Sequence, residues 1–307
     1  MDNHQSSSAD FEIAEFLKII LERKILIISL SFLGGLLFAS LSLLIPNSYK
    51  SEAMLTPEDN DSNMQLLRQY AGLASIAGID LRGESDDLSE EAVERIQSFA
   101  FFNEFILPHV KKQDLIALRK WDAKTDTYIY KKRKFDADQE KWIRRVRFPK
   151  QVIPTAQEAY KKWTKHLSID QDKRTGFVTI SITHRSSKLA KSWLDLIILE
   201  INRSMREEDK IKALKALDFL QNESKKVNYA EIDLAISALQ EEELKSLMMI
   251  EVNEDYVFSI IETPVAKEKK SWPPRSIIAI LGAVIGFLLS SFYIYFRDNK
   301  KVSQLKY

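Results

Sequence analysis

Two uncharged apolar blocks stand near the two ends of the chain and dominate its hydrophobic pattern. The first covers residues 25–45 and the second residues 277–296. A helix rises about 1.5 Å per residue, so each block is long enough to cross roughly 30 Å of hydrocarbon. Aromatic residues border the second block at both edges: Trp272, Tyr293, Tyr295 and Phe296. Such a belt is typical of a membrane interface, and we predict two transmembrane helices.

A cleaved signal peptide is the alternative interpretation of the first block. A mostly polar stretch, residues 1–24, precedes it, and no small-residue cleavage pattern follows, which favours a retained anchor. Both short tails, 1–24 and 297–307, carry Lys or Arg beside the membrane. The positive-inside rule then predicts an inner-membrane protein with cytoplasmic termini and a periplasmic domain over residues 46–276.

The tail before the first block contains a short amphipathic pattern. Asp10 is a candidate helix cap, and apolar residues recur at helical spacing after it: Ile13, Phe16, Leu17, Ile20 and Leu21. This stretch is either a helix on the cytoplasmic leaflet or a plain extension of the first membrane helix.

Between the blocks, the first half of the chain predicts a mixture of strands and helices. Residues 49–57 alternate and end at Pro57, as in a strand, and residues 63–79 have a helical pattern interrupted by glycine. Residues 89–110 predict a helix with a phenylalanine-rich stripe. Pro154-Thr155 marks another helix start, and residues 167–184 predict two strands around a turn at 173–176.

The second half is predicted to be dominated by long helices. From Phe177 to Thr263 there is neither Gly nor Pro. We predict a helix capped at Ser186 or Ser187 that runs to about Asn222, a break at 227–229, a helix over 230–250 and a strand over 256–264. The fold class is an α+β membrane protein, in which two transmembrane helices flank an α/β base domain with a long extended helical hairpin. Such a hairpin cannot bury its apolar stripe alone, so we expect neighbouring chains to cover it.

Charge is balanced overall but is segregated locally. The chain has 45 Lys+Arg and 44 Asp+Glu, which gives no indication of nucleic-acid binding, and it has no cysteine. Residues 80–94 are strongly acidic, whereas residues 131–147 are basic and interleaved with aromatic residues. The basic candidates are Lys131, Lys132, Arg133, Arg144, Arg145 and Arg147. They predict either a contact with a glycan or its lipid phosphate, or a patch that is solvated or faces another subunit. The second alternative is the more common role of such charge runs, and a subunit-facing patch would pair with the acidic segment of a neighbour.

Small residues recur every four positions in the second apolar block, at Gly282, Gly286 and Ser290. This spacing predicts a face for close helix packing, although membrane helices are enriched in Gly and Ser generally.

No motif for catalysis, a metal or a cofactor is present in the sequence. It lacks a P-loop, a dinucleotide-binding glycine motif and a nucleophile elbow, and its four histidines lack metal-ligand spacing. The carboxylate runs Asp86-Asp87 and 241–243 fit solvated helix faces better than a glycosidase pair. We therefore predict no catalytic, cofactor-binding or metal-binding residues.

Several segments together resemble the Wzz family of chain length determinants. They are FEIAEFLKIILERKILII before and into the first apolar block, LASIAGIDL (73–81), VTISITHRSSKLAKSWLDLIILEIN (178–202), and a proline segment before the second block. The prolines are Pro264, Pro273 and Pro274, which are more widely separated than the closely spaced prolines of the family.

The resemblance implies a non-enzymatic polysaccharide co-polymerase without a fused kinase. Such a protein regulates the chain length of lipopolysaccharide O-antigen as a homo-oligomeric ring in the membrane lipid, and it acts on an O-antigen polymerase and on undecaprenyl-linked glycan. A length regulator for capsule or enterobacterial common antigen would have a similar sequence. A membrane-anchored periplasmic glycan enzyme is the alternative from another class, and a sensor-receptor is weakened by the short final tail.

Overall fold

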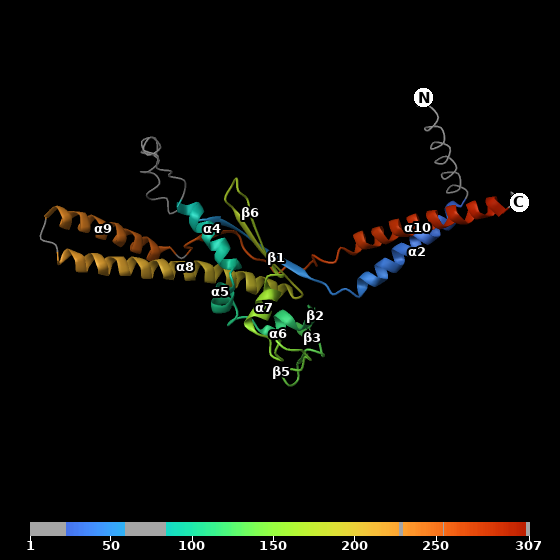
Figure 1. The fold of residues 1–307 in the computed structure, drawn as a ribbon, viewed down its shortest axis with the longest axis horizontal. Helices are drawn as coiled ribbons and strands as arrows, with labels where there is room; N and C mark the ends of the chain where they lie inside the picture. Colours follow the sequence, from blue (N-terminus) through green and yellow to red (C-terminus); the bar gives the residue numbers. More distant parts are fainter. Residues whose placement is uncertain (1–22, 59–83, 227–229, 254, 305–307) are drawn as a thin grey trace, which may run out of the picture. The chain divides into compact units, whose positions relative to one another are not determined.

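The computed structural model describes residues 23–58, 84–226, 230–253 and 255–304 (Figure 1). Contacts divide the chain into two units, each described separately below. One unit comprises the parts of the chain before Ser48 and after Lys269, and the other is Ser48–Lys269. The predicted amphipathic stretch after Asp10, the segment 63–79 and the break at 227–229 lie outside the described residues.

The first unit is a pair of apolar helices packed along each other. They are α2, Lys24–Leu43, and α10, Arg275–Gln304. Both helices are long and apolar enough to cross a membrane. The helix α10 extends past the predicted boundary at residue 296, because the charged residues that end the apolar block continue the helical conformation.

A four-stranded antiparallel sheet organises the second unit, in the order β6-β7-β1-β8. The strands are β1, Tyr49–Pro57; β6, Leu167–Gln171; β7, Val178–His184; and β8, Phe258–Glu262. The expected alternation in β1 is present, since Ser51, Ala53 and Leu55 are buried and their neighbours are not. The predicted turn after β6 contains Gly176 at a φ of +74°, a conformation that glycine adopts without steric cost. The last strand is shorter than the predicted range 256–264.

The predicted helix over 89–110 is broken in the structure. The helix α4, Glu84–Gln97, starts earlier than predicted and stops before Ser98. The backbone of Ser98 is extended, and its hydroxyl caps the next helix by accepting from the N–H of Phe101. The short helix α5, Phe99–Phe101, then continues as the π-helix η1, Phe102–Ile106. Serine interrupts the helix because its hydroxyl replaces a backbone acceptor.

Residues 111–163 form small elements beside the start of the longest helix (Figure 1). They are α6, Lys112–Ile116; β2, Leu118–Asp122; β3, Thr127–Tyr130; β4, Phe135–Asp136; β5, Lys141–Trp142; and α7, Ala156–Trp163. The predicted helix start is confirmed, since Thr155 caps α7 by accepting from the N–H of Glu158. The β2–β3 and β4–β5 hairpins were not predicted from the sequence.

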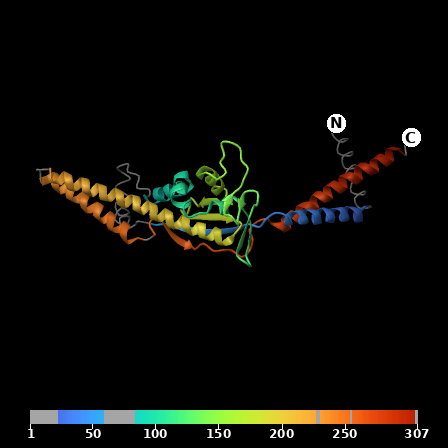
Figure 2. The same cartoon turned by 90° about the horizontal axis from the view of Figure 1, so that it is seen from below.

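The predicted helical hairpin is present within the second unit. Its helices are α8, Ser187–Ser224, and α9, Ala230–Val252, and they lie side by side in both views (Figures 1 and 2). The amino-terminal part of α8 packs on β1 and β7 and contributes Trp193, Ile197 and Ile201 to the core. Farther along, large apolar side chains are exposed on both helices, including Phe219 at 62% and Leu234 at 72%.

Candidate functional site

The turn from β7 into α8 is built around a buried histidine. The backbone N–H of Ser186 donates to Nδ1 of His184 at 3.3 Å, so this nitrogen is an acceptor. Nε2 of the same ring lies 3.2 Å from the carbonyl oxygen of Asp114 and therefore carries the proton. Ser186 in turn caps α8, because its hydroxyl accepts from the N–H of Leu189. The histidine thus fixes the residue that begins the long helix.

Aromatic rings enclose this histidine. The ring centroid of Trp193 lies 4.5 Å from that of His184 and 5.5 Å from that of Trp163, which belongs to α7. The ring of His166 lies 5.2 Å from that of His184, and its Nδ1 contacts the carbonyl oxygen of Thr183 at 2.6 Å. Burial lowers the pKa of His184 to about 3 and also lowers the pKa of His166. Both rings are therefore neutral packing residues near neutral pH.

Farther along α8, a buried asparagine joins the hairpin to the sheet. Oδ1 of Asn202 accepts from the backbone N–H groups of Val257 and Phe258, each at 2.9 Å. Its Nδ2 donates to the carbonyl oxygen of Phe258 at 3.0 Å. One turn later, Arg206 donates to the carbonyl oxygen of Asn253. The long helix is thereby attached to the chain that returns from α9 into β8.

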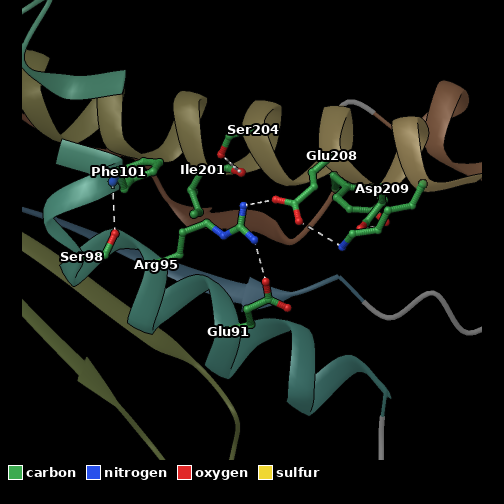
Figure 3. Close-up of polar contacts among 10 residues, drawn as sticks. Glu91, Arg95, Ser98, Phe101, Ile201, Ser204, Glu208 and Asp209 are labelled. Atoms are coloured by element: carbon green, nitrogen blue, oxygen red, sulfur yellow. Dashed lines mark hydrogen bonds and ion pairs between the residues drawn. The ribbon is translucent and has the colours of Figure 1, made fainter. Parts of the chain in front are cut away.

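A second polar group attaches α4 to the same part of α8. Figure 3 shows the guanidinium of Arg95 between the carboxylates of Glu91, at 2.7 Å, and Glu208, at 2.5 Å. The next residue, Asp209, accepts from Lys212 and from the hydroxyl of Tyr256. The hydrogen bond from Arg95 lowers the pKa of Glu208, so this bridge is ionised at neutral pH. Together with Asn202, it fixes how the hairpin leaves the base domain.

The predicted basic segment is divided by the fold into buried and exposed residues. Arg144 is only 7% exposed, and its guanidinium binds both carboxylate oxygens of Glu158. It also donates to the carbonyl oxygens of Gln151 and Val152. The pairing lowers the pKa of Glu158. Arg144, two residues after β5, thus joins this strand to α7, and its guanidinium is engaged within the fold.

The other members of the predicted set remain accessible to different degrees. Lys132, Arg133, Arg145 and Arg147 are exposed, whereas Lys131 is half-buried. The interleaved aromatic residues pack on one another rather than projecting as a row. The centroid of Phe135 lies 5.3 Å from those of both Tyr130 and Trp142. The aromatic rings therefore pack together within this small subdomain, whereas these four cations are exposed.

A polar pair inside the same subdomain completes its packing. The hydroxyl of Tyr130 donates to a carboxylate oxygen of the buried Asp114 at 2.5 Å. Burial is the largest effect on both groups and raises the pKa of Asp114 and of Tyr130. Asp114 also presents the carbonyl group that His184 contacts, so α6, β3 and the start of α8 are joined at one point.

In the helix pair, glycines from both helices face each other. A Cβ added to Gly282 would lie 2.5 Å from Cβ of Phe38 and 2.9 Å from the carbonyl oxygen of Gly34. A Cβ on Gly286 would lie 3.0 Å from the carbonyl oxygen of Leu30. Ser290, the third residue of the predicted face, is buried and its hydroxyl donates to the carbonyl oxygen of Phe287. Gly282 and Gly286 thus allow backbone approach between α2 and α10 of one chain.

The prolines before α10 are separated between the two units. Pro264 is buried beside β1, where the Ser51 hydroxyl donates to the carbonyl oxygen of Val265. Pro273 is buried and Pro274 is exposed in the helix-pair unit, and the Trp272–Pro273 peptide is cis. Of the three prolines, only Pro274 is exposed.

The family comparison concerns the amino-terminal third of the chain. The model of the family described as "Wzz: Chain length determinant protein" matches residues 9–107. This segment is similar to the chain length determinants of that family. The match confirms the resemblance that FEIAEFLKIILERKILII and LASIAGIDL indicated, and it covers α2, β1 and the α4–η1 helices.

Solved structures and curated proteins add further comparisons. A full-length bacterial polysaccharide co-polymerase aligns with a TM-score of 0.39 and 11% identity, covering 93% of this chain and 97% of its own. A fragment of WzzB, a polysaccharide co-polymerase from Salmonella Typhimurium, aligns with a TM-score of 0.31 and 13% identity, covering 74% of this chain and 100% of its own. No curated protein matches the sequence.

The sequence predicted only some of the contacts that join residues 9–107 to the rest of the chain. Arg95 lies inside the segment and Glu208 lies outside it, so their ion pair is a long-range contact that local pattern does not indicate. The Asn202 contacts were missed for the same reason. His184 and Ser186 lie in the segment 178–202 that carries the family resemblance, and the structure supplies their physical role at the start of α8.

Among the described residues, no group of three or more His, Asp or Glu side chains has an arrangement that could hold a metal ion. The carboxylate run on α9 lies on a largely exposed helix face, where Glu241 pairs with Lys245 one turn away.

Proposed function

We propose that this protein is a non-enzymatic regulator of polysaccharide chain length, and that its polysaccharide is the O-antigen of lipopolysaccharide. The observation that carries the proposal is the match of residues 9–107 to the chain length determinant family. The protein would act as an oligomeric scaffold in the inner membrane for the O-antigen polymerase and the growing undecaprenyl-linked glycan.

The apolar helix pair supports the membrane part of this proposal. Large apolar side chains cover the outer faces of α2 and α10, such as Phe32 at 71% exposure. Continuous apolar surface of this length is stable in lipid rather than in water. In the proposed topology the termini are cytoplasmic, residues 25–45 and 277–296 cross the membrane, and residues 46–276 are periplasmic.

The exposed apolar side chains of the hairpin support the oligomeric part. Phe219 on α8 and Leu234 and Met248 on α9 are mostly exposed in the single chain. A contiguous set of such residues is characteristic of a surface that another protein covers. A ring of identical chains would cover them with the hairpins of neighbours, and cyclic symmetry would let every subunit use the same pair of faces.

The experiment is the lipopolysaccharide ladder on a gel, compared between the wild-type strain, a deletion of this gene and its complemented strain. The proposal expects the deletion to keep making polymer but to lose a preferred cluster of lengths. A deletion strain that makes no polymer at all would indicate an enzyme of synthesis instead. If the ladder is unchanged, the same comparison for capsule and for enterobacterial common antigen distinguishes another polysaccharide from another function.

A further inference from the structure

Four cationic side chains from three separate parts of the fold converge beside the strip of backbone from Ile116 to Arg119. We call them the cationic cluster: Lys131, Lys134, Lys162 and Arg185. Two of them belong to the turn between β3 and β4, one to the end of α7, and one to the turn between β7 and α8.

Hydrogen bonds locate three members of the cluster around this strip. The backbone N–H of Lys131 donates to the carbonyl oxygen of Ala117 at 2.8 Å. The side chain of Lys134 donates weakly to the carbonyl oxygen of Ile116 at 3.4 Å. Nη1 of Arg185 donates to the carbonyl oxygens of Leu118, at 2.5 Å, and Arg119, at 2.8 Å. Lys162 lies close enough to repel both lysines.

The cluster has no carboxylate partner of its own. Among the described residues, none of its four side chains forms an ion pair, although all four are half-buried. The carboxylate that acts on Lys134 is Glu158, and Arg144 occupies both of its oxygens. The nearby ring of His166 is neutral, because burial lowers its pKa. Positive charge therefore accumulates at this point without compensation.

This arrangement is unfavourable for the free protein. Burial is the first cause that lowers the pKa of Lys131 and of Lys134, and the neighbouring cations lower both further. A lowered lysine pKa means that the protonated form is held at a cost, which an added anion removes. The strip holds the side chains of Lys134 and Arg185 and the backbone of Lys131 in place, so these cations stay close together.

The unpaired donors of the cluster indicate the kind of ligand that would suit it. Nε and Nη2 of Arg185 have no partner in the described part of the chain, and neither do the ammonium groups of Lys131 and Lys162. A guanidinium edge and several ammonium groups suit an oxyanion with several charged oxygens, which accepts from all of them at once. A single carboxylate would leave most of these donors unpaired.

We propose that the cationic cluster is a binding site for a phosphate or pyrophosphate group. The site deepens the proposed function and rests on it for the source of its ligand, because a polyprenyl-linked glycan carries such a group between lipid and sugar. Binding would hold the glycan carrier on the base domain beside the start of α8. The chemistry itself is shared with phospholipid headgroups and with free pyrophosphate.

The test is isothermal titration calorimetry of the full-length protein in phosphatidylcholine nanodiscs with sodium pyrophosphate. The variant is the pair Lys131→Gln and Lys162→Gln, whose ammonium groups make no described hydrogen bond within the fold. The matched control is the adjacent pair Lys132→Gln and Lys161→Gln, which removes the same charge from exposed residues. Loss of two charge-assisted contacts is expected to weaken binding at least about tenfold in the variant and to leave the control within about twofold.

Two results would overturn the site: no pyrophosphate binding by the wild-type chain, or equal weakening in the variant and the control. The source of the ligand is determined by repeating the wild-type titration in nanodiscs that contain polyprenyl pyrophosphate or phosphatidic acid. Competition by the polyprenyl lipid alone supports the glycan carrier. Competition by both supports lipid phosphate in general, and competition by neither supports a site for soluble phosphate.

These binding results are independent of the gel ladder. A cluster that binds pyrophosphate, in a protein whose deletion leaves the ladder unchanged, keeps the site and removes the proposed function. If the deletion alters the ladder but the protein binds no pyrophosphate, the proposed function stands and the site is removed.

Discussion

The backbone N–H of Ser186 donates to Nδ1 of His184, and the hydroxyl of the same serine caps the first turn of α8. The start of the longest helix therefore depends on a neutral imidazole. A protonated ring would place an N–H against the N–H of Ser186, so the turn and the charged histidine are incompatible.

Acid should consequently destabilise the fold. Burial lowers the pKa of His184 from 6.5 to about 3. Between these values the unfolded chain binds a proton that the folded chain does not, so the free energy of unfolding falls as pH decreases from about 6.5. The slope from this group is at most about 1.4 kcal/mol per pH unit, and it vanishes above that range. Denaturant unfolding of the full chain in detergent at several pH values measures it.

The control for this prediction uses the exposed His109. His184→Gln should reduce the acid slope, because glutamine does not titrate and the contribution of the buried His166 remains. His109→Gln should retain the full slope. An acid slope that is unchanged in His184→Gln would show that other groups cause the loss of stability.

Elements with local signals were predictable from the sequence, and elements made by distant contacts were not. The strand 49–57 was predicted with its observed bounds because alternation and a closing proline define it. The helix from Ser187 was predicted because a cap precedes a long stretch without Gly or Pro. The break at Ser98 was missed, since a serine inside a helical pattern ends the helix only when its hydroxyl accepts from the next turn.

In the candidate site, too, local composition was predictable and long-range pairing was not. The excess of cations in 131–147 was evident, but its most buried member, Arg144, owes its role to Glu158 and to two carbonyl groups that chain folding brings to it. Likewise, Lys162 and Arg185 lie outside the basic segment, and only the fold places them beside Lys131. Composition predicts where charge is dense, and it does not predict which charges are paired.

Arg144 and Arg145 should therefore differ strongly despite being adjacent. Arg144→Ala leaves a half-buried carboxylate and two carbonyl groups without this partner, and we expect a loss of about 2–4 kcal/mol in the free energy of unfolding. Arg145→Ala, at an exposed position, should change it by less than about 0.5 kcal/mol. Denaturant unfolding of both variants checks the contrast, and similar stabilities would contradict the assigned role of Arg144.

Loss of the Asn202 side chain should loosen the hairpin from the sheet. Asn202→Ala removes three buried hydrogen bonds to Val257 and Phe258, and we expect a cost of about 2–4 kcal/mol. In a domain of this size that lowers Tm by roughly 5–15 °C. Asn103→Ala, at an exposed position in η1, is the control and should leave Tm nearly unchanged. An equal Tm for the two variants would contradict the role given to Asn202.

The helix pair permits a covalent test, because the chain contains no cysteine. A Cβ on Gly35 would lie 3.3 Å from Cβ of Ala283, so a small outward shift reaches the separation of about 3.5–4.5 Å found in disulfides. The variant Gly35→Cys with Ala283→Cys should form an intramolecular disulfide under mild oxidation, measured by thiol titration and gel mobility. The control pair, Leu36→Cys with Leu281→Cys, uses exposed positions and should remain reduced within one chain. A disulfide in the control pair and not in the first would overturn the observed helix packing.

The central claim is that this protein sets the length of a polysaccharide without making it. The most direct measurement is densitometry of the O-antigen ladder in a deletion strain, with and without a plasmid copy of the gene. The account predicts that the deletion strain makes O-antigen with no preferred length and that the plasmid restores the preferred cluster. A ladder with the same preferred cluster in all strains would contradict it.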